Sequence, residues 1–233
     1  MNWMGRKVIA VDGLYNDKKV DHFIATKQRW AQQAAQAMRG GLVLETHAGY
    51  GFTTLTYALN GAKEVVSFDK SNEAIEALRQ NCHGLSVTAV CGNSETSLPD
   101  GWFDIVDIDA SGSPQFVLDA VLQRPQPKIL FVTVGDALYF RFRRHPSTPA
   151  GVKRYPQAFP AFISECDKGM REFGRRVVFS HIQETWKKAN LAAYHVWPLT
   201  SSSRMVVTFP HSPVVNWDTP EQAAIWAMTQ AKG

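Results

Sequence analysis

The chain has 233 residues, a length that fits one domain of ordinary size. Hydrophobic residues make up 45% of it and charged residues 20%, a composition that supports a packed core and excludes wholesale disorder. The net charge of +4 is modest, and no apolar run approaches the roughly 18–20 residues that a membrane span needs, so an integral membrane protein is excluded.

Apolar segments with the periods of strands and helices alternate along the chain. Short apolar runs predict strands over residues 7–11, 42–44, 65–68, 85–90, 105–108 and 129–134. Helical periodicity predicts helices over residues 21–38, 53–60, 72–81, 160–173 and 220–232. Two β-branched runs, 176–180 and 204–209, lack a convincing crossover between them and predict an antiparallel partner at the sheet edge. The alternation predicts a doubly wound, mostly parallel α/β sheet.

In such a sheet the ligand crevice lies beyond the carboxyl ends of the strands. Residues that directly follow each strand are therefore the candidates for chemistry. They are the 45–51 loop, Asp69, the 91–94 loop, Asp109 and the turn at Asp136.

The segment after the 42–44 strand reads as an acid, Glu45, followed by Gly49-Tyr50-Gly51 at the start of a helix. Glycines let the backbone approach a ligand closely and adopt positive φ. A dinucleotide loop would carry a third glycine where this chain has Thr54, and an acid ahead of the glycines suits a ligand amino group better than a pyrophosphate. The alternative interpretation is a tight strand-to-helix turn with an incidental glutamate.

Asp69 ends the next strand, 24 residues after Glu45. A carboxylate there can accept hydrogen bonds from both hydroxyls of a ribose. Together the Glu45 to Gly51 motif and Asp69 resemble class I S-adenosylmethionine-dependent methyltransferases, over roughly residues 42–209. The resemblance implies a Rossmann-like, mostly parallel seven-stranded sheet with a terminal antiparallel strand.

The same resemblance implies S-adenosyl-L-methionine as the cofactor. Glu45 and the glycine loop would face its methionine part, Asp69 its ribose, and the 91–94 loop its adenine. The full set of expected cofactor-binding residues is Glu45, Thr46, Ala48, Gly49, Gly51, Asp69, Lys70, Asn93, Ser94 and Asp107. We expect three parts in the chain: a helical, substrate-side extension over 1–41, the methyltransferase domain over 42–209, and a C-terminal helix over 210–233 packed on that domain.

The 105–108 strand carries two aspartates at its end. Asp109 would lie beside the transferable methyl group, and it is the candidate catalytic residue that orients the acceptor or takes its proton. Asp107 interrupts a strand that otherwise reads as buried, and a buried carboxylate needs either a partner or a function. A structural carboxylate bonded to nearby backbone or to a serine is the alternative for Asp107.

This stretch is also similar to the tRNA guanine-N2 dimethyltransferase family, where the segment reads Asp-Leu-Asp-Pro-Phe-Gly-Ser-Pro before a Phe-Leu-Asp-Ala helix. The matching positions are Asp107, Asp109, Gly112, Ser113, Pro114, Leu118, Asp119 and Ala120. Ala110 and Ser111 stand where the family has a proline and the aromatic residue that stacks on the target base.

A second resemblance is to O-methyltransferases of the catechol type, in which the strand-end aspartate binds a divalent metal. In this chain Asp109 would take that place, with Asp136 as a candidate second ligand. A complete ligand set is not evident, and we expect no metal.

Basic residues are concentrated between positions 139 and 176. This segment contains nine Lys and Arg and three Asp and Glu, a local charge of 9 − 3 = +6. Cations neutralise phosphates and aromatic rings stack on bases, so this composition is typical of a nucleic-acid surface. The candidate substrate-binding residues are Arg141, Arg143, Arg144, Lys153, Arg154 and Tyr155. A solvated loop, or one that holds an acidic small molecule or a protein, is the alternative.

Three isolated cysteines without CxxC or Cys/His clustering favour the reducing cytoplasm. The sequence as a whole predicts a cytoplasmic S-adenosylmethionine-dependent methyltransferase that binds nucleic acid and modifies a base amino group in tRNA or another RNA. RNA is favoured over DNA, and methylation of a DNA amino group is close behind. The alternatives are a small-molecule O- or N-methyltransferase, and a non-catalytic adenosine- or nucleic-acid-binding module of the same fold.

Overall fold

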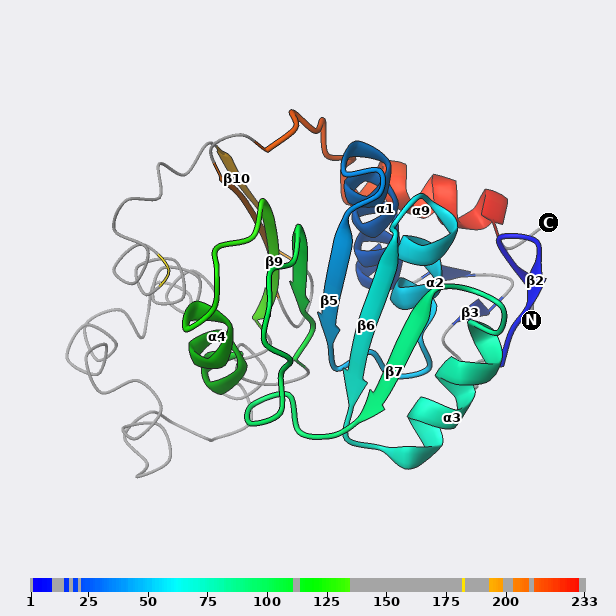
Figure 1. Ribbon diagram of the computed structural model, residues 1–233. Helices are drawn as coiled ribbons and strands as arrows, with labels where there is room; N and C mark the ends of the chain where they lie inside the picture. The colour runs from blue at the N-terminus through cyan, green and yellow to red at the C-terminus, as the bar shows by residue number, and fades with distance from the viewer. Residues whose placement is uncertain are drawn as a thin grey trace, which may run out of the picture.

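The computed structural model describes residues 2–9, 15–16, 19–20, 22–110, 114–134, 182, 193–198, 203–209 and 212–230 (Figure 1). The predicted helix over 160–173, the predicted strand over 176–180 and the basic segment between 139 and 176 lie outside the described residues. Within the described part, no helix is both long and apolar enough to cross a membrane.

A seven-stranded sheet forms the centre of the structure, with the strand order β10-β11-β9-β8-β5-β6-β7. The strands are β5 (Leu42–Thr46), β6 (Glu64–Asp69), β7 (Val87–Cys91), β8 (Ile105–Ile108), β9 (Ile129–Val134), β10 (Ala193–Pro198) and β11 (Ser203–Thr208). Strands β5 to β9 pair in parallel, whereas β11 runs antiparallel to both of its neighbours, β9 and β10. The predicted mostly parallel sheet with a terminal antiparallel strand is confirmed.

The partner of the antiparallel strand at the sheet edge differs from the prediction. Strand β11 pairs on one side with β9 and on its outer side with β10, a strand that the sequence pattern does not predict. His195 and Pro198 interrupt the apolar pattern of β10, so periodicity does not reveal this strand. The predicted strand over 7–11 is also wrong in its bounds, because the N-terminus forms a hairpin of β1 (Asn2–Trp3) and β2 (Arg6–Lys7). A second short hairpin joins β3 (Tyr15–Asn16) to β4 (Lys19–Val20).

The helices are α1 (His22–Ala37), α2 (Phe52–Leu59), α3 (Asn72–Asn81), α4 (Gln115–Leu122) and α9 (Pro220–Gln230). Helices α1 and α2 cover one face of the sheet, where Trp30 and Tyr57 pack with Val43 and Phe131. Helix α4 covers the opposite face, on which the alternate residues of the same strands are buried (Figure 1). Burial on both faces makes each strand almost continuously apolar, which is why the sequence pattern locates the strands well.

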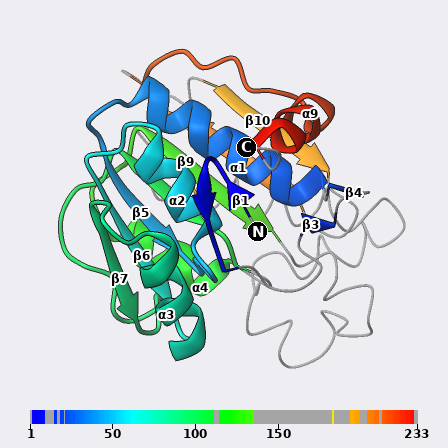
Figure 2. The same ribbon diagram turned by 90° about the vertical axis from the view of Figure 1, so that its right-hand side faces the viewer.

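The N-terminal hairpin ties several helices together. Trp3 is fully buried, with its ring 6.2 Å from that of Phe52 in α2 and 5.7 Å from that of Trp226 in α9. The side chain of Asn81 accepts from Ile9 N at 2.7 Å and donates to Ile9 O at 2.9 Å. Helix α9 itself lies along α1, as Figure 2 shows.

The turn from β5 into α2 depends on two glycines with different constraints. Gly51 has φ 79°, and a Cβ added there would lie 2.5 Å from Leu78 Cγ of α3. Gly49 has φ 54°, but a Cβ at that position would meet nothing within 4 Å. Gly51 therefore permits a close helix–helix approach, whereas Gly49 only provides a left-handed backbone beside open space.

We expect Gly51→Ala to lower the free energy of unfolding by about 2–4 kcal/mol, because it adds a steric clash to the strain of a left-handed alanine. Gly49→Ala is the matched control and should cost about 1–2 kcal/mol, since only the backbone strain applies. Urea denaturation of the two variants measures the difference. Equal losses would mean that contact with Leu78 does not limit this turn.

Candidate active site

The loops that follow the parallel strands are joined by backbone hydrogen bonds at one edge of the sheet. Ala48 N donates to Phe68 O at 2.8 Å, so the loop after β5 is held to the end of β6. Gly92 N donates to Asp69 O at 3.0 Å, which holds the loop after β7 to the same place. The structure thus brings together three of the loops that the strand-end rule selected.

The carboxylate of Asp69 is fixed by backbone donors from both sides. Its Oδ2 accepts from Gly49 N at 2.9 Å, and its Oδ1 accepts from Ser71 N at 2.9 Å. Asp69 is only half-buried, and each carboxylate oxygen can accept a second hydrogen bond. A preoriented carboxylate beside the open space at Gly49 fits the recognition of ribose hydroxyls.

The residues expected around an adenine lie in the loop that follows β7. Asn93 is exposed, and its Oδ1 accepts from Glu95 N at 2.9 Å, which shapes the turn after β7. Ser94 is buried beneath that turn, and Lys70 is exposed next to Asp69.

Glu45 lies under the glycine loop, with its side chain almost fully buried. Its Oε2 accepts from Thr54 Oγ1 at 2.5 Å and from Ser67 Oγ at 3.3 Å. Burial, together with the negative charge of Asp107, raises the pKa of Glu45 to about 8. Glu45 is therefore mostly protonated at neutral pH. Thr54, which stands where a dinucleotide loop would have glycine, serves here as a hydrogen-bond donor to the acid.

His47 carries a feature that the sequence analysis missed. It has φ 60°, in the left-handed region that glycine usually occupies. Its Nδ1 lies 3.1 Å from the hydroxyl of Thr46, which is fully buried. Burial lowers the pKa of His47, which favours the neutral imidazole.

Asp109 lies at the end of β8 with 14% of its side chain exposed. Its Oδ2 forms an ion pair with Nζ of Lys27 from α1, and its Oδ1 is 4.0 Å from Nη1 of Arg204 from β11. Burial would raise the pKa of Asp109, but the charges of Lys27 and Arg204 outweigh it and lower the pKa. Asp109 is therefore a carboxylate at neutral pH, able to accept but not to donate a hydrogen bond.

Asp107 is fully buried inside the sheet. Its Oδ2 accepts from Arg204 Nη2 at 2.7 Å and from the Tyr57 hydroxyl at 2.8 Å. The prediction that grouped Asp107 with the cofactor-binding residues is corrected by this position, because a side chain with no exposed surface does not reach a ligand. Its partners are an arginine and a tyrosine from distant strands and helices, not nearby backbone or a serine.

Arg204 is the residue that joins the two aspartates. It is fully buried, donates from Nη1 to Thr133 Oγ1 at 2.9 Å, and lies 4.9 Å from the centre of the Phe131 ring. Sequence analysis missed Arg204 and Lys27, which are 97 and 82 residues from their aspartate partners. One signal in the sequence could have identified the pair. Arg204 and Asp107 each interrupt an otherwise apolar strand, and their opposite charges must be paired if both strands are buried.

Several other predicted site residues lie outside the described part of the chain. These are Arg141, Arg143, Arg144, Lys153, Arg154, Tyr155, Ser111, Gly112, Ser113 and Asp136. Ala110, which replaces the proline of the guanine-N2 pattern, is buried. Among the described residues, no group of three or more His, Cys, Asp or Glu side chains is placed to hold a metal ion.

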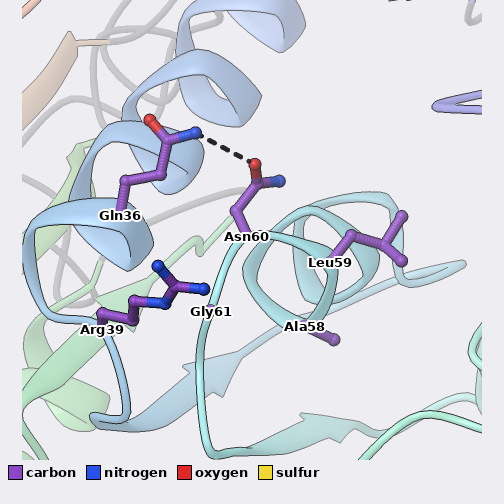
Figure 3. A pocket seen from close by; sticks show the side chains of 6 residues that line it. All are labelled: Gln36, Arg39, Ala58, Leu59, Asn60 and Gly61. Atoms are coloured by element: carbon purple, nitrogen blue, oxygen red, sulfur yellow. Dashed lines mark hydrogen bonds between the residues drawn. The ribbon is translucent and has the colours of Figure 1, made fainter.

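A cleft of about 470 Å³ lies elsewhere, between the ends of α1 and α2 (Figure 3). Gln36, Arg39 and Asn60 line it, and Gln36 donates to Asn60 Oδ1 at 3.3 Å. The loops that form it precede strands β5 and β6, so it opens at the edge of the sheet opposite to Asp69 and Asp109.

Comparison with known proteins gives a fold but no relative by sequence. No protein-family model and no curated protein sequence matches the chain. Trm1 from Pyrococcus horikoshii, in complex with S-adenosyl-L-methionine, matches with a TM-score of 0.63 at 18% identity, over 93% of this chain and 60% of that one. The N-methyltransferase NodS from Bradyrhizobium japonicum WM9 matches with a TM-score of 0.53 at 10% identity, over 84% and 97%.

These matches define the architecture. The fold is that of the class I S-adenosylmethionine-dependent methyltransferases, as the strand-end motifs predicted. The chain spans about 60% of the length of the Trm1 chain that it matches.

We expect Arg204→Met to lower the free energy of unfolding by about 3–5 kcal/mol, because Asp107 is then left charged and unpaired in the core. The double variant Arg204→Met/Asp107→Leu should recover most of this loss, since it leaves no buried charge at that position. Arg79→Met, which breaks an exposed ion pair with Glu76, is the control and should change stability by less than about 1 kcal/mol. If the double variant is no more stable than Arg204→Met, the unpaired charge of Asp107 is not the cause of the stability loss.

The raised pKa of Glu45 predicts a pH-dependent stability. Its contribution is fully present below the ordinary value of 4.5 and is lost as pH rises through about 8, because only the unfolded chain ionises readily in that window. Between pH 5 and 8.5 we expect the wild type to lose on the order of 3–5 kcal/mol relative to Glu45→Gln. Urea unfolding at both pH values measures this, with the exposed Glu76→Gln as a control that follows the wild type. Parallel profiles for wild type and Glu45→Gln would show that Glu45 ionises normally.

Proposed function

We propose that this protein is an S-adenosylmethionine-dependent methyltransferase that acts on a base amino group in RNA, with tRNA as the favoured substrate. The observation that carries the proposal is the presence of two carboxylates, Asp69 and Asp109, at the carboxyl ends of two parallel strands, β6 and β8. Asp69 is held by a hydrogen bond from Gly49 N, at a glycine beside open space, and Asp109 is kept ionised at the end of β8.

The described residues fit the cofactor. Asp69 would hold the ribose hydroxyls, and the backbone around Gly49 would allow the methionine part to approach closely. Asn93 and Ser94 would flank the adenine, and Glu45 would support the glycine loop from below. When bound, S-adenosyl-L-methionine supplies an activated methyl group on its sulfonium sulfur, so the protein's task is positioning and electrostatics.

Asp109 would act on the acceptor. As a carboxylate it accepts a hydrogen bond from the acceptor's N–H and so directs the nitrogen lone pair toward the methyl carbon. As the new N–C bond forms and the S–C bond breaks, the nitrogen must lose one proton. Asp109 is placed to accept it or to pass it to water, and Lys27 and Arg204 stabilise the carboxylate before transfer.

Three features support a nitrogen on an RNA base as the acceptor. Trm1, a tRNA guanine-N2 dimethyltransferase, and the N-methyltransferase NodS share the fold, and both are described as enzymes that methylate a nitrogen atom. The 107–120 segment is similar to the guanine-N2 family in sequence. The basic and aromatic segment between 139 and 176, with Arg141 and Tyr155 among its residues, has the composition of an RNA surface.

The test is transfer of a labelled methyl group to unfractionated RNA, DNA and small metabolites. We expect label in RNA, and Asp109→Asn should lower kcat about 100-fold or more while cofactor binding is retained. Asp69→Ala should instead weaken cofactor binding at least about tenfold, because charge-assisted hydrogen bonds to the ribose are lost. The exposed Asp100→Ala is the matched control and should behave as the wild type.

The other outcomes are equally informative. Label confined to metabolites would overturn the nucleic-acid substrate. Cofactor and RNA binding without transfer to any fraction would favour the non-catalytic module.

A further inference from the structure

Lys27 is a cation beside Asp109 that lies in a helix and not directly after a strand, so its place at the site could not be predicted from strand ends. It projects from α1 and forms an ion pair with Asp109 Oδ2, although 82 residues separate the two in the chain. The side chains of Lys27 and Asp109 are 15% and 14% exposed, so part of each side chain reaches the surface. Arg204, the other cation near Asp109, is fully buried and bound to Thr133 and Asp107, so it does not reach a ligand.

The charges around Asp109 are balanced. Asp107 is matched by Arg204, and Asp109 is matched by Lys27. Glu45, another described acid that interacts electrostatically with both aspartates, is mostly protonated at neutral pH because its pKa is about 8. Counted over these five described side chains, the cluster therefore presents a carboxylate and an ammonium side by side, without a net negative charge.

This arrangement selects among the possible nitrogen acceptors. A cationic amine would meet the positive charge of Lys27 directly beside the negative charge of Asp109, so it would gain little by entering. An amino group on a nucleobase is neutral and stands beside a ring nitrogen or a carbonyl oxygen that accepts hydrogen bonds. Such an edge needs one acceptor and one donor from the protein, and Asp109 and Lys27 are those two groups.

We propose that Lys27 is a specificity-determining residue: it donates to the ring nitrogen or carbonyl oxygen beside the target amino group while Asp109 accepts from that amino group. The pair thereby selects a neutral nucleobase edge and rejects cationic amines. This inference rests on the proposed function and names the part of the substrate that the site reads. Because Lys27 is carried by α1, it also gives this helix a direct role in acceptor recognition.

Steady-state methyl transfer tests the proposal with two acceptor probes, unfractionated tRNA and the cationic amine spermidine. For the wild type we expect transfer to tRNA and none to spermidine. Lys27→Met should raise KM for tRNA about tenfold, the loss of one charge-assisted hydrogen bond, and leave the Kd for S-adenosyl-L-methionine unchanged. Lys27→Arg keeps a cationic donor and should recover most of the wild-type KM.

Lys128→Met is the matched control. Lys128 forms an ion pair with Asp104 at 3.0 Å, at the start of strands β8 and β9 and so at the opposite edge of the sheet. Loss of a lysine–aspartate pair there should leave both KM and kcat for tRNA unchanged. Circular dichroism confirms that each variant is folded, and Lys27→Gln replaces Lys27→Met if that variant is not.

The outcomes separate this inference from the function on which it rests. Unchanged KM in Lys27→Met, faster transfer to tRNA by that variant, or transfer to spermidine by the wild type would overturn the role of Lys27 and leave RNA methylation standing. If the wild type binds the cofactor but methylates no RNA, the proposed function itself fails.

Discussion

The buried ion pair between Asp107 and Arg204 is the interaction on which the site depends. Both side chains are fully buried, and taking two charges out of water costs several kcal/mol per ion unless they meet in good geometry. Asp107 belongs to β8 and Arg204 to β11, on either side of β9. The pair therefore links β8 to β11 across β9, to which Arg204 also donates at Thr133, and it constrains how the antiparallel strand β11 is inserted into an otherwise parallel region.

The same arginine carries this constraint to the surface of the crevice. Nη2 of Arg204 binds Asp107, while Nη1 lies 4.0 Å from Asp109, the carboxylate at the strand end. Asp109 is held from the other side by Lys27 of α1. An interaction that stabilises the interior thus also helps to keep a carboxylate ionised where an acceptor would bind. The negative charge of Asp107 has a further effect, since it contributes to the raised pKa of Glu45 beneath the glycine loop.

The two halves of the crevice are built in different ways. The proposed cofactor half consists of loops that directly follow β5, β6 and β7, and backbone N–H groups of these loops donate to Phe68 and Asp69 at the end of β6. The acceptor half combines the end of β8 with side chains from α1 and β11, which are far apart in the chain. The first arrangement uses residues local to the strand ends, and the fold that carries them is shared with Trm1 at 18% identity. The second arrangement depends on individual side chains from distant elements, so proteins with the same fold can differ in their acceptor.

Sequence patterns alone predict the succession of strands and helices in the parallel part of the sheet, the glycine turn and the positions of Asp69 and Asp109. These features are local: burial on both faces makes strands continuously apolar, and parallel strands place their carboxyl ends at one edge. The three-dimensional fold was needed to show that Asp107 is an interior ion-pair residue and that Lys27 lies against Asp109. Those contacts join residues 82 or more positions apart, and no periodicity or motif spacing records which distant cation compensates a buried acid.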